Sequence, residues 1–136
     1  MIDFARFSAQ GRLAYIQETA NRRGLLPIIV EKDFWVCFIL KMLFDLPQFS
    51  GAFVFKGGTS LSKVFGIIKR FSEDIDVSVS PEYLGFSAAQ LSDATASRSQ
   101  FEKRCKALEK KCSAFIEQTL FSALDAAITG AIGPSV

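Results

Sequence analysis

The chain has 136 residues, 49% of them hydrophobic, and a formal net charge of +2. This length predicts a single domain, residues 1–136, with one core, and so small a net charge does not by itself indicate a nucleic-acid-binding protein. The sequence has no His and three Cys without a Cys-x-x-Cys pair, which excludes the common zinc sites and His-based acid–base chemistry.

The sequence also carries signals about the cellular compartment. The three Cys lie in helical patterns, which is typical of reduced packing residues. The N-terminal stretch MIDFARFSAQGR has an early acid and lacks the apolar segment of a signal peptide. The longest apolar run, residues 34–46, is interrupted by Lys41 and Asp45 and is too short to span a bilayer. We therefore expect a soluble, cytoplasmic protein without a membrane partner.

Residues 1–50 are expected to form a helical lead-in. Ser8–Arg23 has the apolar spacing of a helix, and Gly24 is placed to end it. Leu25–Val30 is interpreted as an apolar connector. A second helix is predicted over Glu31–Leu46, because apolar residues recur at i, i+3, i+4 and i+7 and cover most of its circumference, so that it should be buried on more than one side. Its stripe comprises Trp35, Phe38, Ile39, Met42, Leu43 and Leu46.

Residues 52–80 are expected to form the core that carries the motifs. Ala52–Lys56 predicts a short buried strand, and a Gly-Gly turn and a helical pattern follow it. Asp74–Ser80 alternates between polar and apolar residues, which predicts a second strand that ends at Pro81.

The remainder of the chain is expected to be a loop followed by a long helix. Residues 81–99 predict a loop with one helical turn, and residues 100–128 predict the helix. Apolar residues near one side of this helix are Phe101, Cys105, Leu108, Cys112, Phe115, Leu120 and Leu124, and the outer face carries Lys103, Arg104, Lys106, Lys110 and Lys111. The basic face could contact RNA, but a solvated surface with intrahelical ion pairs is the favoured interpretation.

Two aspartates in the second strand are candidate metal ligands. A strand rises about 3.3 Å per residue and alternates its faces, so Asp74 and Asp76 should project to the same side, about 7 Å apart at the backbone. Two like charges so placed repel each other unless a cation lies between them, and Mg²⁺ commonly uses one or two protein carboxylates. Taken alone, Asp-x-Asp more often marks a solvated strand edge.

The glycine turn is a candidate phosphate site. A strand–GGTS–helix sequence brings free backbone N–H groups to a helix N-terminus, and glycine lets the backbone approach a ligand closely. About sixteen residues separate this turn from the acidic strand, so together they predict a nucleotide site with a metal. The candidate phosphate contacts are Gly57, Gly58, Thr59, Ser60, Lys63, Arg70 and Ser72; for Lys63 a solvated helix surface is slightly favoured.

The stretch FKGGTSLSKVFGIIKRFSEDIDVSV resembles the N-terminal signature of the abortive-infection nucleotidyltransferase toxins (AbiEii/AbiGii type) of the polymerase-beta-like nucleotidyltransferase superfamily. The upstream stretch PIIVEKDFWVCFILKMLF is similar too, so the resemblance covers roughly residues 26–80 and includes Glu31, Lys32 and Asp33. It implies that residues 57–60 hold the nucleotide and that Asp74 and Asp76 bind catalytic Mg²⁺. It further implies nucleotide transfer from an NTP to an acceptor of the tRNA class, in a toxin–antitoxin or phage-defence system with a protein antitoxin.

The expected fold is α/β in the broad sense (α+β), a nucleotidyltransferase-like core with a small mixed sheet packed against helices. The resemblance implies that full family members are longer and that their later segments add a lysine and a further acidic motif. After Ser80 this sequence has no such motif, and Asp93 and Asp125 lie in unsuitable surroundings. We therefore expect either the N-terminal half of an active enzyme or a truncated, catalytically silent homologue that binds nucleotide or a protein partner. A helical scaffold with a merely solvent-facing acidic strand is the remaining alternative.

Overall fold

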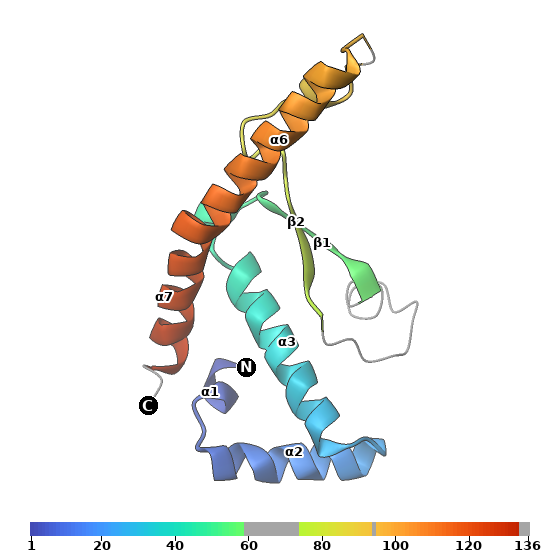
Figure 1. The fold of residues 1–136 in the computed structure, drawn as a ribbon. Coiled ribbons are helices and arrows are strands. Elements are labelled where there is room, and N and C mark those ends of the chain that lie inside the picture. Colours follow the sequence, from blue (N-terminus) through green and yellow to red (C-terminus); the bar gives the residue numbers. More distant parts are fainter. Residues whose placement is uncertain (59–73, 94, 134–136) are drawn as a thin grey trace.

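The computed structural model describes residues 1–58, 74–93 and 95–133 and combines helices with a pair of strands (Figure 1). The α+β class expected from the sequence is confirmed. The two described strands run antiparallel; a mixed sheet would need a parallel strand, which the described residues do not contain. Figure 1 shows α1 and α2 at one end, the strand pair beside α3, and a long C-terminal helical arm that runs past both.

The first helices follow their sequence signals closely. A short helix, α1 (Ile2–Ala5), precedes α2 (Ala9–Arg23), whose N-terminus is capped by Ser8 through a 3.1 Å hydrogen bond donated by the Gly11 backbone N–H. Gly24 ends α2 in the left-handed conformation with φ of 64°, which glycine adopts without steric cost. The predicted helix over residues 8–23 is confirmed.

The third helix begins earlier than the sequence pattern indicated. Helix α3 spans Pro27–Phe44, so the predicted apolar connector over residues 25–30 is wrong for its last four residues. Pro27 occupies the first helical position, where its fixed φ suits a helix and its missing N–H would have had no intrahelical partner. The buried residues of α3 are Val36, Phe38, Met42 and Leu43.

The strands are β1 (Phe53–Lys56) and β2 (Asp76–Val79), and a short 3₁₀ turn over Pro47–Phe49 precedes them. The first predicted strand is confirmed as a strand, but the prediction that it is buried is wrong, because its residues alternate between half-buried and exposed. The second is shorter than predicted, because Asp74 lies before it and the residue opposite Lys56, the last of β1, is already Asp76.

A continuous helical arm follows the loop after β2. Helix α5 (Ala88–Leu91) is the single helical turn expected there, and the arm consists of α6 (Arg98–Phe115), a π-helical segment (Ile116–Leu120) and α7 (Phe121–Ile132). The predicted helix over residues 100–128 is thus confirmed and is longer at both ends, whereas the π-helical segment was not predicted.

The core joins the N-terminal helices to the arm. Ala5, Phe38 and Met42 form its buried centre, and side chains from α1, α3 and α7 pack around it. A 2.6 Å hydrogen bond donated by Arg6 Nε to the carbonyl oxygen of Ala131 also ties α1 to the end of the arm.

A second cluster, which consists of Phe49, Phe53, Tyr83 and Phe115, fixes β1 to the middle of the arm. The ring centroids of Phe49 and Phe115 are 5.4 Å apart, and those of Tyr83 and Phe115 are 5.5 Å apart, both in edge-to-face geometry. The Tyr83 hydroxyl donates a 3.1 Å hydrogen bond to the carbonyl oxygen of Gln48.

The outer half of α6 makes little contact with the rest of the described chain. This helix has no buried residue, and Phe101 and Cys105, which the apolar stripe predicted to pack inward, are exposed. Its main anchor is Arg104, which donates to the Gln90 carbonyl oxygen at 2.7 Å and pairs with Asp93 at 3.3 Å. Within the described residues, no helix is both long and apolar enough to cross a membrane.

Candidate nucleotide and metal site

The strand pair has one face turned to the helices and one turned away. Residues directly opposite one another in an antiparallel pair share a face. On the inner face, Phe53 and Phe55 are half-buried, and Phe44 of α3 contacts both rings at centroid distances of 6.2 and 6.3 Å. Their partners across the sheet are Val79 and Val77. The inner face is therefore covered by apolar contacts, and a ligand could reach the strand pair only at its outer face.

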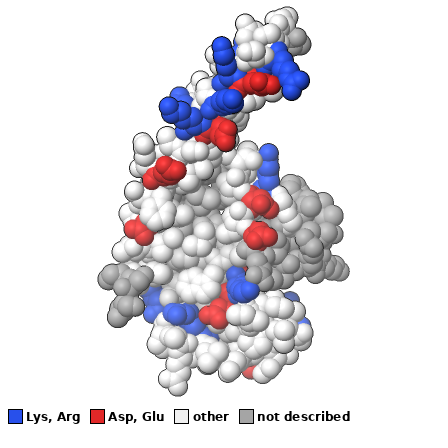
Figure 2. Space-filling view, in the orientation of Figure 1, with Lys and Arg blue, Asp and Glu red and all other residues white. Residues whose placement is uncertain are grey.

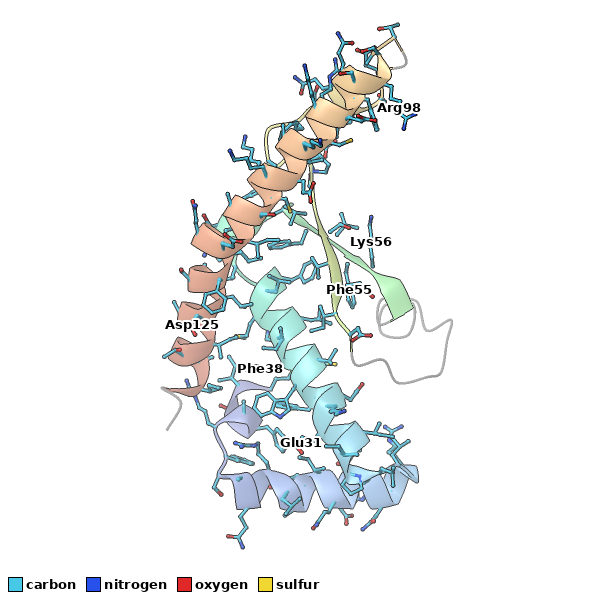
Figure 3. The ribbon with its side chains drawn as sticks, viewed as in Figure 1. Glu31, Phe38, Phe55, Lys56, Arg98 and Asp125 are labelled. Atoms are coloured by element: carbon cyan, nitrogen blue, oxygen red, sulfur yellow. The ribbon has the colours of Figure 1, made fainter. Side chains whose placement is uncertain are left out.

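The outer face presents an exposed cation directly opposite an exposed carboxylate. Lys56 and Asp76 are register partners, as are Val54 and Ser78. Both charged residues are exposed, and Figure 3 shows Lys56 on the side of the strand pair that faces away from α3. In Figure 2, basic and acidic side chains lie next to one another over this part of the molecule.

Gly57 brings the predicted phosphate turn against the predicted metal ligand. A Cβ atom at this position would lie 1.9 Å from Oδ2 of Asp76 and 2.7 Å from its Cγ, far inside van der Waals contact. Gly57 also has φ of 74°, a left-handed conformation that favours glycine. The two motifs that the sequence separates by a long interval are thus in direct contact.

Asp74 occupies a different setting from Asp76. It is exposed and precedes β2, so the regular alternation that should send both side chains to the same side does not apply to it. Gly58 directly follows Gly57 at the end of β1. The other predicted site residues, Thr59, Ser60, Lys63, Arg70 and Ser72, lie outside the described residues.

The carboxylates fit magnesium better than a metal that needs an all-protein cage. The described residues contain no group of three or more His, Cys, Asp or Glu that could hold an ion. Magnesium usually binds through one or two carboxylates and completes its octahedron with waters and substrate phosphates. Asp74 and Asp76 are both exposed, and Asp76 lies beside the predicted phosphate turn, so their chemistry is compatible with such a site.

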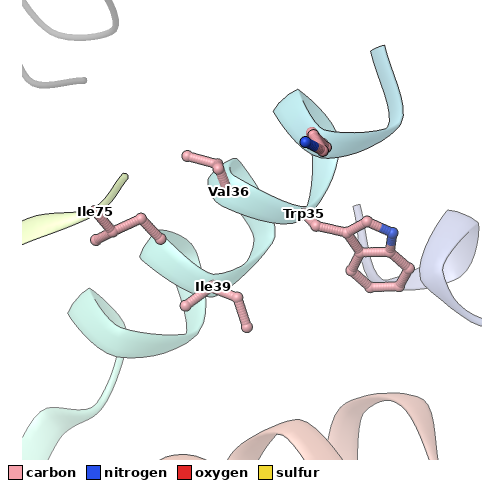
Figure 4. Close-up of a pocket in the computed structure, with 5 residues that line it drawn as sticks. Trp35, Val36, Ile39 and Ile75 are labelled. Atoms are coloured by element: carbon pink, nitrogen blue, oxygen red, sulfur yellow. The ribbon is translucent and has the colours of Figure 1, made fainter. Parts of the chain in front are cut away.

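Lys32, part of the Glu-Lys-Asp pattern over residues 31–33, borders a cavity of about 290 Å³ between α3 and the segment before β2. Figure 4 shows Trp35, Val36 and Ile39 of α3 at this cavity, with Ile75 on the opposite side. Ile75 separates the two aspartates in sequence, so the acidic segment and α3 line the same cavity. The cavity gives Lys32 a structural setting that the sequence did not reveal.

The predicted basic face of α6 is partly engaged in local contacts. Arg104 pairs with Asp93, and the Lys111 ammonium lies 5.6 Å from the centroid of the Phe86 ring. Lys103, Lys106 and Lys110 are exposed, and basic side chains gather at the outer end of the arm in Figure 2. These three residues therefore form the open part of the basic face.

The described residues thus combine an α+β fold with a glycine turn that lies against an acidic strand. The sequence model of the family described as "Nucleotidyl transferase AbiEii toxin, Type IV TA system" matches residues 39–133. The chain belongs to this family of toxin–antitoxin nucleotidyltransferases. No curated protein and no solved structure matches it.

The family match covers a different part of the chain from the resemblance noted in the sequence. The resemblance noted over residues 26–80 stopped before the arm, whereas the family match includes the loop after β2 and the whole arm from α6 to α7. The match begins at residue 39 and so leaves out the Glu-Lys-Asp pattern. The arm therefore belongs to the family domain and is not an unrelated extension.

Proposed function

We propose that this protein is a magnesium-dependent nucleotidyltransferase toxin that transfers a nucleotide from an NTP to an RNA acceptor of the tRNA class. The observation that carries the proposal is the contact between Asp76 and Gly57. A metal ligand and a phosphate-binding turn serve the same substrate only if they lie within one triphosphate of each other, and here they touch. Family membership supports the same reaction class.

The chain's own residues would divide the work at this site. Because Gly57 has no Cβ, the Asp76 carboxylate can lie against the backbone of the glycine turn, and the backbone N–H groups of Gly57 and Gly58 would bind the phosphates. Asp74 and Asp76 would hold Mg²⁺, which when bound polarises the α-phosphate and neutralises the leaving pyrophosphate. The acceptor hydroxyl oxygen would form the new bond to the α-phosphorus as the bond to pyrophosphate breaks.

Two partners complete the proposal. Lys103, Lys106 and Lys110 on the exposed part of α6 suit the phosphate backbone of an RNA acceptor. A protein antitoxin is the expected neutralising partner, as in the toxin–antitoxin systems for which the family is named.

Calorimetric titration with each NTP and Mg²⁺ tests the proposal. The wild type should bind at least one NTP, and Asp76→Asn, which keeps the size of the side chain but removes its charge, should weaken binding at least tenfold, the loss of about one charge-assisted contact. Asp125→Asn is the matched control, because Asp125 is an exposed aspartate on α7. Its variant should bind as the wild type does.

A transfer assay with labelled NTP and tRNA then separates enzyme from silent homologue. Label in the RNA supports the proposed reaction. Binding without transfer to any RNA would identify a catalytically silent relative, and the absence of NTP binding by the wild type would contradict the site itself.

A further inference from the structure

We propose that Lys56 is a phosphate-binding residue of this site, whose ammonium contacts the triphosphate of the NTP while Asp76 opposite it holds the metal. The inference rests on the proposed function and adds to it a residue for which neither the glycine turn nor the acidic pair gives any indication. It is argued from the register of the strands, the exposure of the two side chains and the absence of an ion pair between them.

The register places Lys56 where a triphosphate must pass. Lys56 is the last residue of β1 and lies directly opposite Asp76, the first residue of β2. Side chains so paired extend from the same face, with Cβ atoms about 5 Å apart. Lys56 is also the residue immediately before Gly57, so its ammonium, the glycine turn and the Asp76 carboxylate all border one small area.

The cation and the carboxylate do not neutralise each other. Among the described residues, no ion pair joins Lys56 to Asp76, although the chain forms such pairs elsewhere, as between Arg22 and Glu18 at 2.6 Å. The Asp76 carboxylate is instead directed at the Gly57 backbone. Both charges are thus exposed side by side on the outer face.

A magnesium–triphosphate complex satisfies both charges at once. Its phosphate oxygens are anionic and attract an ammonium, while its cation attracts a carboxylate, so each group of the protein meets the opposite sign. Lysine suits this role because its ammonium is a compact charge at the end of a flexible chain and can follow a phosphate. A lysine that only solubilises the strand edge would give no such pairing.

Three variants test the inference: Lys56→Gln, Lys56→Arg, and Arg23→Gln as the control, at an exposed basic position on α2. Calorimetry measures the affinity of each for NTP with Mg²⁺, and paramagnetic resonance measures the binding of Mn²⁺ alone. Lys56→Gln should weaken NTP binding about ten- to hundredfold, as expected for a lost charge-assisted contact, and should leave Mn²⁺ binding unchanged. Lys56→Arg should retain most of the affinity, and Arg23→Gln should bind NTP normally.

The outcomes distinguish a failure of the inference about Lys56 from a failure of the proposed function. If the wild type binds NTP and Lys56→Gln binds it equally well, the inference is wrong and the proposed function stands. An equal loss of Mn²⁺ and NTP binding in Lys56→Gln would also overturn it, because Lys56 would then act only by supporting Asp76. If the wild type binds neither Mn²⁺ nor NTP, the proposed function fails and this inference fails with it.

Discussion

Gly57 is the residue on which the geometry of the candidate site depends most directly. Two requirements coincide there: a left-handed backbone and the space taken by the Asp76 carboxylate. Gly51 has nearly the same φ, 75°, but an added Cβ would meet nothing within 4 Å. Comparing substitutions at Gly57 and Gly51 therefore distinguishes the effect of backbone strain from the effect of crowding at the site.

Replacing Gly57 with Ala should disrupt the site, whereas replacing Gly51 with Ala should only strain the backbone. Each variant should lose about 1 kcal/mol of unfolding free energy from its left-handed conformation. In Gly57→Ala the new methyl group must also displace Asp76, so affinity for NTP and Mg²⁺ should fall at least tenfold. Denaturant unfolding and calorimetry measure the two effects; equal affinities in the two variants would contradict the proposed contact.

The Asp93 carboxyl provides a prediction about pH. Its pKa lies below the ordinary value because the Thr95 hydroxyl donates a hydrogen bond to it, the Thr95 backbone N–H donates another, and Arg104 adds a favourable charge. A carboxyl whose pKa is lowered by folding stabilises the protein above its unfolded-state pKa, near 3.9, and loses that contribution as the pH falls through the folded-state pKa.

Thr95→Val should therefore be less stable than the wild type at pH 7. The difference should shrink as the pH falls below about 4 and vanish once Asp93 is protonated in the folded state as well. Unfolding by denaturant at a series of pH values measures it. Because Asp93→Asn cannot titrate, adding Thr95→Val to that variant should give a stability difference that does not change over this range.

Only those parts of the candidate site that form motifs with a characteristic spacing along the chain could be predicted from the sequence. The glycine turn and the acidic pair are recognisable because both follow strand patterns at short range. Lys56 was missed, since its importance comes from the register that places it opposite Asp76, and a sequence does not state which residues face each other across a sheet. A charged residue next to a glycine turn at a strand end was the one signal that could have indicated it.

At the level of elements, local chemistry predicted most of the fold. The apolar spacing over residues 8–23, the stop at Gly24 and the alternation in the second strand led to correct elements. The start of α3 was misjudged: residues 25–30, which contain Pro27, were interpreted as a connector, although proline at the first helical position favours a helix. The exposure of Phe101 could not be foreseen, since an apolar stripe does not reveal whether a neighbouring element reaches it.

The cluster of aromatic rings at Phe115 should be the main link between the strand pair and the arm. Phe115→Ala removes contacts with Phe49, Phe53 and Tyr83, so the unfolding free energy should fall by about 2 kcal/mol, less than for a fully buried phenylalanine because Phe115 is half-buried. Phe121→Ala, at a side chain that is 71% exposed, is the matched control and should change it little. Similar losses in the two variants would show that the cluster contributes no specific stability.

At the level of the whole molecule, the arm separates two regions with different tasks. Its inner end, α7, packs on the core with α1 and α3, while the outer half of α6 extends away from them (Figure 1). Because α6 has no buried residue, its charged side chains can be changed without disturbing the core.

Removing charges from the outer half of α6 should weaken RNA binding in a salt-dependent way. The triple variant Lys103→Gln, Lys106→Gln and Lys110→Gln should bind tRNA less tightly, and the slope of log affinity against log salt should become shallower by roughly 0.7–0.9 for each lost phosphate contact. Fluorescence anisotropy at several salt concentrations measures this slope. Arg23→Gln, at an exposed position on α2, is the control, and an unchanged slope in the triple variant would remove α6 from the RNA interface.

The π-helical segment Ile116–Leu120 makes the direction of the basic face a matter of residue count. A π turn accommodates one residue more than an α turn, so deleting Thr119 would allow α6 and α7 to continue as one regular α-helix. Because successive residues of an α-helix differ by about 100° around its axis, that deletion would rotate every side chain of α6 by this angle while α7 stayed on the core. The number of residues in this segment therefore sets the direction in which the lysines of α6 point relative to the core.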